Sequence, residues 1–302
     1  MRLYLLFWIL SVSTMLSVLQ AANAQTAEDQ KLSAFFDEQW EYSMKQNPVF
    51  ASLLGDLRYN NLLPDVSLEA IKKDQTHDLS VLKQLQIIDR TKLSDANQLN
   101  YDLYLLNTQE SIEGHKFPDY LMPINQMGGI QQQVPDTVGQ LPFQNTKHYE
   151  DYVSRLNYFP LMMDQTLERL KEGLKRKITP PRITLRDVAE QIKAHATSTV
   201  ENSVFYQPFK NFPESVSQTD QERLRKLGSE AVRTKVLPSY QKLYEFWTTE
   251  YFPNTREAIG LSALPDGKEW YAYNARVSTT TDLTPQQIHE IGLREVAKSD
   301  NH

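Results

Sequence analysis

The chain has 302 residues, no cysteine, and 32 lysines and arginines against 38 aspartates and glutamates, which gives a formal net charge of -6. The absence of cysteine excludes disulfide bonds, thiolate metal ligands and a lipid anchor on cysteine. The acidic residues are spread along the chain, so nucleic acid and anionic membrane surfaces are not expected as partners.

The N-terminal segment has the features of a secretory signal. An apolar run over residues 3–19 follows a single positive charge, and Ala-Asn-Ala at 22–24 supplies a small-x-small cleavage site. This arrangement is typical of a cleavable Sec signal peptide over residues 1–24, so the mature protein is expected to be periplasmic or secreted. An uncleaved anchor is the alternative, because the run is long for a signal peptide. After cleavage, no stable membrane insertion is expected.

Three helices are predicted in the first part of the mature chain. The first ends at Asn47-Pro48, because the residue before proline disfavours helix, and Ser67 and Ser94 are placed to cap the other two. The expected buried residues of the first are Leu32, Phe35, Phe36, Trp40 and Met44. Those of the other two are Leu68, Ile71, Leu79, Leu82 and Leu85, and then Leu99, Leu103, Leu106 and Ile112.

The longest helical patterns lie in the middle of the chain. One begins near Thr146 and has Pro160 as a kink or break. Its expected buried residues are Tyr149, Val153, Leu156, Met163, Leu167, Leu170 and Leu174. Thr219 and Glu222 have capping-box spacing and predict a further long helix, kinked at Pro238. Its expected buried residues are Leu224, Leu227, Ala231, Tyr240, Leu243, Trp247 and Tyr251.

Two segments do not show helical spacing. Residues 120–137 form a polar stretch with paired glycines, which indicates a loop with either a binding role or a structural one. A turn at 265–267 is followed by aromatic and β-branched residues, which predict a strand or hairpin near 268–280. The sequence therefore predicts a mainly α protein, an elongated multi-helix array with this short strand or hairpin.

These two segments also hold the candidate binding residues. Asn125 and Gln126 of the loop, and Tyr273 and Arg276 of the predicted hairpin, are proposed as polar contacts in the wall of a substrate cleft. Structural roles explain the four residues equally well.

A histidine-glutamate pair near the C-terminus raises the question of a metal site. Thr284, Pro285 and Gln287 predict a helix start, so His289 and Glu290 lie on a helix. A helical zinc-protease motif needs a second histidine one turn later, and that position is Leu293. The pair is therefore interpreted as structural, and no catalytic residue, metal ligand or cofactor is assigned to this chain.

Four stretches carry a family resemblance: MPINQMGGIQQQVP, HYEDYVSRLNYFPLMMDQTLERLKEGLKRKITPPR, SVFYQPF and WYAYNARVSTTTDLTPQQIHEIGLREVAK. From about Leu32 to Lys298 the sequence resembles the bacterial "domain of unknown function 885" family. The resemblance implies a mostly helical protein similar to zinc metallopeptidases of the gluzincin type, often exported and acting on peptides.

The resemblance also has a boundary. In that family the zinc signature and a later Glu-Gly-Trp stretch follow the helix that contains His289, whereas here residues 299–302 do not resemble the continuation. The resemblance thus implies that residues 25–302 are the N-terminal helical part of a metallopeptidase-like domain, truncated before the zinc-binding half and inactive alone. Zinc is expected only for a full-length member.

Two other readings stay open. The chain could be a stand-alone periplasmic helical protein that binds or scaffolds without catalysis, or, less well supported, an enzyme that uses the polar loop and the hairpin. Expected partners are peptides and, through packing surface left exposed, other copies of the chain.

Overall fold

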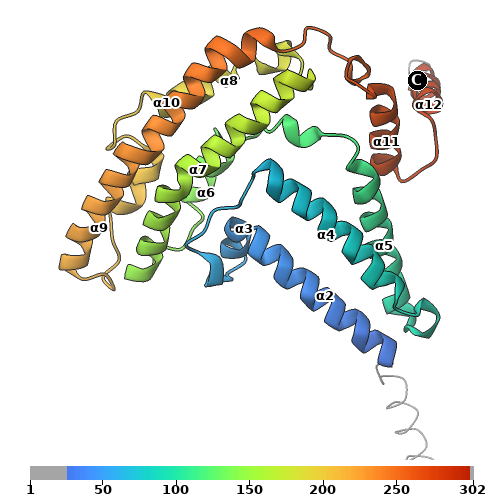
Figure 1. The fold of residues 1–302 in the computed structure, drawn as a ribbon, viewed down its shortest axis with the longest axis horizontal. Helices are drawn as coiled ribbons and strands as arrows, with labels where there is room; N and C mark the ends of the chain where they lie inside the picture. The colour runs from blue at the N-terminus through green and yellow to red at the C-terminus, as the bar shows by residue number, and fades with distance from the viewer. Residues whose placement is uncertain (1–25, 300–302) are drawn as a thin grey trace, which may run out of the picture. The chain divides into compact units, whose positions relative to one another are not determined.

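The computed structural model describes residues 26–299. The predicted signal peptide, residues 1–24, lies outside the described residues. Every regular element of the described chain is a helix or helical turn, and its only extended pairings are isolated bridges between Asn125 and Gly128 and between Pro181 and Arg256 (Figure 1). The predicted mainly α fold class is therefore confirmed. None of the helices between residues 26 and 299 has the length and apolar character needed to cross a membrane.

The described residues form two compact units. Unit 1 contains residues 26–41 and 77–112, and unit 2 contains residues 42–76 and 113–299. Three helices contribute residues to both units: α2 (Ala27–Gln46), α4 (Leu68–Gln86) and α5 (Asp95–Gly114).

Unit 1 encloses a small apolar cluster and the buried carboxylate of Asp29. Its buried apolar residues are Leu32, Phe35, Val81, Leu85, Ile88, Leu93 and Tyr101. A 3-10 turn, Arg90–Lys92, connects α4 to α5. At the start of α2, Asp29 N donates to Thr26 Oγ1 at 2.9 Å and Thr26 N donates to Asp29 Oδ2 at 3.0 Å, which is a reciprocal helix cap.

The same carboxylate connects α2 to α5. Asp29 Oδ1 accepts from Asn97 Nδ2 at 2.9 Å and from both the backbone N and the hydroxyl of Ser94 at 3.0 and 3.1 Å. The bond from Asn97 first, and those from Ser94 and Thr26 with it, hold the pKa of Asp29 well below its usual range. Ser94 stands immediately before α5 as predicted, but its hydroxyl donates to Asp29.

The prediction of which face of α5 is buried is wrong. Leu99, Leu103 and Leu106 are exposed, and the buried residues are Tyr101 and Thr108. Apolar residues stand on two faces of α5, and the face with the larger aromatic rings packs inward: Tyr104 lies 5.3 Å from the rings of Phe35 and of Phe36. Trp40 and Leu79, which were also expected in the core, are exposed.

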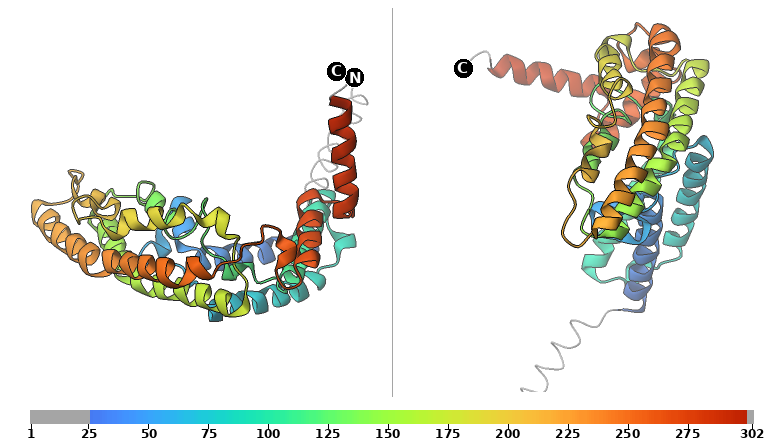
Figure 2. Two further views of the ribbon diagram at one scale, coloured as in Figure 1. Left: turned by 90° about the horizontal axis from the view of Figure 1, so that it is seen from above. Right: turned by 90° about the vertical axis from the view of Figure 1, so that its left-hand side faces the viewer.

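Four helices form the main core of unit 2. They are α7 (Thr146–Arg176), α8 (Val188–Ala196), α9 (Gln218–Ala231) and α10 (Leu237–Phe246). α7 packs against α9 and α10, and α8 packs against α10 (Figures 1 and 2). The shorter elements are α3 (Pro48–Leu53) and α6 (Gln133–Val138), and the 3-10 turns Leu57–Tyr59, Asp119–Leu121, Arg182–Leu185, Val204–Phe209, Phe252–Asn254 and Leu261–Ala263.

α7 matches its prediction closely. Asn145 caps it by accepting from His148 N at 3.1 Å, and it ends where Lys177 adopts a left-handed backbone with φ of 58°. The helix continues through Pro160, so the predicted break is absent within residues 146–176. All the residues expected in its core face are buried except Leu174, which is partly buried.

The predicted long helix after residue 217 is also present, with a different start. Ser217, rather than Thr219, is the cap, and its Oγ accepts from Asp220 N at 3.2 Å. α9 and α10 are joined by a π-helical turn, Val232–Val236, and a second π turn, Trp247–Tyr251, follows α10. Leu237 N donates to Val232 O, five residues back, directly before Pro238, which has no N–H to donate.

The C-terminal segment corrects one prediction and confirms another. Residues 267–279 form α11 (Gly267–Thr279), not a hairpin. Trp270 and Tyr273 stand three residues apart and both pack on Phe117, at ring distances of 5.5 and 5.2 Å, so the aromatic residues follow a helical period. α12 (Pro285–Ser299) begins with the predicted cap, in which Thr284 N donates to Gln287 Oε1 at 2.8 Å.

Candidate functional site

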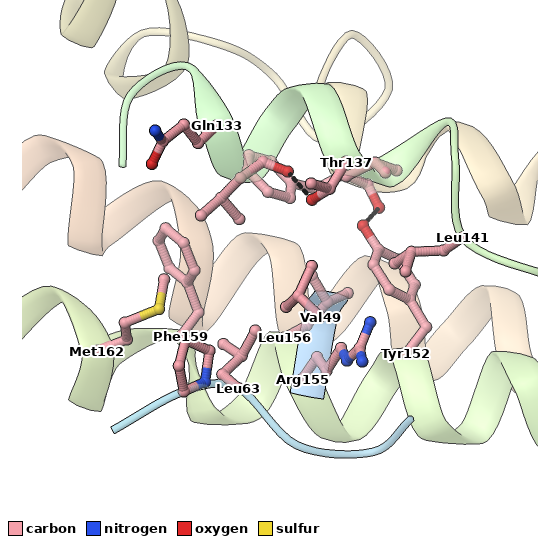
Figure 3. Close-up of a pocket in the computed structure, with 14 residues that line it drawn as sticks. Val49, Leu63, Gln133, Thr137, Leu141, Tyr152, Arg155, Leu156, Phe159 and Met162 are labelled. Atoms are coloured by element: carbon pink, nitrogen blue, oxygen red, sulfur yellow. Dashed lines mark hydrogen bonds between the residues drawn. The ribbon is translucent and has the colours of Figure 1, made fainter. Parts of the chain in front are cut away.

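An apolar hollow of unit 2 lies between α6, α7 and the segment 49–64 (Figure 3). We call it the α7 pocket, and its volume is about 190 Å³. It is lined by Val49, Leu63, Pro64, Gln133, Val134, Thr137, Val138, Leu141, Tyr152, Arg155, Leu156, Phe159, Met162 and Phe205. Apolar side chains therefore supply most of its wall.

The helical period of α7 brings one wall together. Tyr152, Leu156 and Phe159 recur every three or four residues, and Arg155 and Met162 lie three residues from Tyr152 and Phe159, so the five share one face of the helix. All five are buried. Figure 3 shows them opposite the α6 residues that line the pocket. α7 thus provides a rigid floor, and the short α6 covers it.

Arg155 holds in place the third wall of the pocket, which is the segment 49–64. Its Nε donates to Leu62 O at 2.9 Å, and its Nη2 donates to Pro48 O at 3.1 Å and to Ser52 Oγ at 2.7 Å. These bonds hold the segment that carries Val49 and Leu63 against α7. The guanidinium therefore has a structural role at the edge of the pocket.

The charge of Arg155 is unusually buried. The side chain is 3% exposed, and among residues 26–299 it forms no salt bridge within 4.0 Å. Burial lowers the pKa of Arg155 to about 10, and the charge of nearby Asp151 acts in the opposite direction. Asp151 itself pairs with Lys147 and accepts from Asn60 Nδ2 at 3.3 Å.

The hydroxyl groups around the pocket are already engaged. Tyr152 Oη donates to Phe205 O at 3.0 Å, and Thr137 Oγ1 donates to Val134 O at 2.8 Å. Burial raises the pKa of Tyr152, so its phenol stays protonated at neutral pH. The arrangement is suited to holding an apolar group, and it places no activated nucleophile in the pocket.

The four predicted cleft residues fall in two separate places. Asn125 and Gln126 lie in an exposed turn beside α8: Asn125 Oδ1 accepts from Met127 N at 2.8 Å, and Gln126 O accepts from Gln191 Nε2 at 3.2 Å. The loop predicted over residues 120–137 is shorter than expected, because its end forms α6.

Tyr273 and Arg276 lie together on α11. They line an open hollow of about 250 Å³, and Arg276 Nη2 pairs with Glu113 Oε2 at 2.5 Å. Glu269 and Asp282 add acidic groups to the hollow. The first pair of predicted residues does not line this hollow, so one cleft formed by all four is not what the structure shows.

The histidine-glutamate pair of α12 does not have the geometry of a helical zinc motif. His289 and Glu290 are both exposed on α12, and Glu290 Oε1 accepts from Gln286 Nε2 at 3.0 Å. Adjacent residues on a helix point in different directions, and Leu293 occupies the position of the second ligand. Across residues 26–299, no three His, Asp or Glu side chains are close enough to share a metal ion.

Sequence reasoning missed the α7 pocket, although one signal was present. Arg155 interrupts the apolar stripe of the predicted helix, between Tyr152 and Phe159. A charged residue on a face that otherwise reads as core is uncommon and indicates a special environment. The wall formed by α6 could not be inferred, because the sequence predicts a loop over most of that segment.

Comparisons with known proteins place these features in context. Residues 48–302 match the family described as "Bacterial protein of unknown function (DUF885)". A crystal structure described as a "putative lipoprotein" from Colwellia psychrerythraea shares the fold with a TM-score of 0.78 at 20% sequence identity. The likeness covers 90% of this chain and 50% of that one, so this chain spans about half the length of its structural neighbour. A comparison with curated proteins gave no match.

Proposed function

We propose, on the premise that this chain belongs to the bacterial protein family of unknown function 885, that its residues form the N-terminal helical part of an exported protein of the zinc-metallopeptidase type. In this proposal the chain contributes a wall of helices and a binding surface. The zinc ligands and the catalytic base come from residues outside it.

One observation carries the proposal: nearly the whole chain adopts the fold of half of a longer protein. α12 is consistent with such an arrangement, because its apolar residues Ile291, Leu293 and Val296 are exposed and Figure 2 shows the helix projecting away from α11. An amphipathic helix without a fully buried residue is typically completed by a further surface. A second copy of the chain would also cover it, which supports self-association.

An activity assay tests the proposal directly. The mature chain, residues 25–302, is incubated with a mixed peptide library, with and without added zinc, and bound zinc is measured after dialysis. We expect neither hydrolysis above the zinc-only control nor one equivalent of bound zinc. Zinc-dependent hydrolysis that is lost with a chelator and restored by zinc would contradict the proposal.

The coding DNA provides a second test. Its sequence is read in all three frames beyond the codon for His302. A downstream segment that encodes a His-Glu zinc motif and a Glu-Gly-Trp stretch is the expected result. If no frame encodes such a segment, the metallopeptidase proposal is contradicted, because no source of the zinc ligands remains.

Export is tested on the protein itself. N-terminal sequencing of the chain recovered from its bacterial host is expected to begin at Gln25, in the periplasmic or secreted fraction. A mature protein that retains residues 1–24 would contradict the proposed cleavage.

The α7 pocket favours a second candidate function. A helical protein with one well-formed apolar pocket is equipped to bind a ligand without catalysis. A saturable binding isotherm that is unchanged by a chelator, in a chain without hydrolytic activity, is the result that distinguishes this function from a structural part alone.

A further inference from the structure

The α7 pocket has room for one small apolar group. An apolar cavity of about 150 Å³ binds benzene, and the α7 pocket measures about 190 Å³. An aliphatic or aromatic group of about six to eight carbon atoms is therefore the size that the lining of Leu156, Phe159 and Met162 accepts. Filling this space adds dispersion contacts that the lining side chains otherwise lack.

The polar atoms at the pocket determine which polar group a ligand can carry. The hydroxyls of Tyr152 and Thr137 donate to backbone carbonyls and leave no free O–H. Arg155 is different, because Nε and Nη2 donate to the segment 48–62 while Nη1 has no hydrogen-bond acceptor within residues 26–299. A guanidinium is planar, and its N–H groups match the oxygens of a carboxylate.

The local charges favour an anion. Arg155 is buried without a salt bridge among the described residues, and Asp151, whose charge acts on it, is paired with Lys147. A buried cation that lacks a direct anionic partner is costly. A carboxylate brought by a ligand would supply the missing partner at the edge of the same pocket.

We infer that the α7 pocket binds an apolar monocarboxylate, whose chain lies between α6 and α7 and whose carboxylate accepts from Arg155 Nη1. Two sources present this chemistry: a free medium-chain fatty acid, and the C-terminal residue of a peptide with an apolar side chain. The inference concerns residues of this chain only and holds whether or not the chain is part of a metallopeptidase.

Calorimetric titration of the mature chain at neutral pH tests the inference. The probes are octanoate and 1-octanol, which share the chain length, and N-acetylleucine and N-acetylleucinamide, which share the side chain. In at least one pair the carboxylate is expected to bind about tenfold more tightly than its neutral partner, as a charge-assisted hydrogen bond provides. The pair with the tighter carboxylate identifies the source. Equal affinities within both pairs, or no binding by any probe, would overturn the inference.

A pair of valine variants locates the site. Val49→Phe places a ring in the pocket, whereas Val200→Phe adds the same ring at a half-buried valine that packs on the same core but does not line the pocket. We expect the first to weaken binding of the preferred carboxylate about tenfold or more, by loss of the space that the ligand occupies, and the second to leave it unchanged. Equal affinity in both variants would place the ligand elsewhere and overturn the assignment.

A third variant does not depend on Val49→Phe folding. Met162→Ala enlarges the pocket, so the preferred chain length is expected to move from octanoate to decanoate. An unchanged preference, in a variant whose circular dichroism matches the parent chain, would also count against the site.

Discussion

The two units treat their buried polar atoms differently. In unit 1, both oxygens of the buried Asp29 carboxylate accept hydrogen bonds, and they connect α2 to α5 around a small apolar cluster. In unit 2, the indole nitrogen of Trp247 and the hydroxyl of Tyr251 are buried without a partner in the part of the chain that the structure describes. The part of unit 1 around Asp29 therefore depends on a polar network, whereas the part of unit 2 around Trp247 and Tyr251 depends on aromatic packing.

This difference follows from the size of the two cores. The core of unit 2 contains tilted ring pairs from α7, the Val204–Phe209 turn and α10, such as those among Phe159, Phe205 and Tyr240. So much buried aromatic area offsets the cost of a few unpaired polar atoms. The cluster of unit 1 is smaller, so each hydrogen bond of Asp29 contributes a larger share of its stability.

The largest expected effect is a cavity in the aromatic core of unit 2. Phe209 is 0% exposed and lies 5.7 Å from the ring of Tyr152. Phe209→Ala should lower the free energy of unfolding by about 3–5 kcal/mol, as buried phenylalanine truncations do. Urea unfolding, followed by tryptophan fluorescence of the buried Trp247 and Trp270, measures it. Phe50→Ala, at a 51% exposed phenylalanine of the same unit, is the control and should cost about 1 kcal/mol or less.

The second effect tests the polar network of unit 1. Asp29→Asn keeps the size of the side chain but places an NH₂ group against backbone donors, so the variant should be less stable than the parent at neutral pH. Because the fold lowers the pKa of Asp29, its contribution is present above the unfolded pKa of about 3.9 and is lost as the pH falls through the lower folded value.

The parent chain should therefore lose stability as the pH falls below about 5, and Asp29→Asn should show a shallower loss. Thermal melts at a series of pH values measure this dependence. Asp37→Asn, at an exposed carboxylate of the same helix, is the control. A parallel pH profile for the parent and Asp29→Asn would show that unit 1 does not depend on this carboxylate.

The third effect comes from added volume at Gly173, where the backbone of α7 lies close to two other backbone segments of unit 2. A Cβ at Gly173 of α7 would lie 2.8 Å from both Ile178 O and Leu121 O, which are backbone atoms that cannot turn aside. Gly173→Ala is expected to cost about 1–3 kcal/mol, as overpacking does. At Gly139 a Cβ meets nothing within 4 Å, so Gly139→Ala should be neutral or slightly stabilising. Equal unfolding midpoints for the two variants would contradict this packing.

The same comparison explains what the sequence could and could not predict. α7 has a single stripe of large apolar residues, so helical periodicity identified its buried face. In α5 a leucine stripe and a tyrosine stripe compete, and the choice depends on Phe35 and Phe36 of another helix. Periodicity within one helix cannot decide between two such faces.

α11 and the α7 pocket show two further limits. The residues after Asp266 are aromatic and β-branched, a composition that favours a strand. The segment is a helix, and the three-residue spacing of Trp270 and Tyr273 places both rings on the helix face that packs on Phe117. Arg155 interrupts the apolar face of its helix, a signal that the sequence-based prediction did not use. The atoms that its guanidinium contacts, at Pro48 and Leu62, are about a hundred residues away, so only the fold brings them together.

The smallest expected effect tests whether aromatic packing alone supports the part of unit 2 around Trp247 and Tyr251. Tyr251 is 0% exposed, its ring lies 4.8 Å from Trp247, and its hydroxyl has no partner within residues 26–299. Tyr251→Phe keeps the ring and removes a buried hydroxyl that no hydrogen bond compensates. The free energy of unfolding should therefore fall by less than about 0.5 kcal/mol, or rise. Tyr240→Phe is the matched control, because its hydroxyl donates to Ile130 O at 3.0 Å and its loss leaves that carbonyl without this donor. A larger loss for Tyr251→Phe than for Tyr240→Phe would mean that the Tyr251 hydroxyl is bonded in solution, and the contrast between the two units would then disappear.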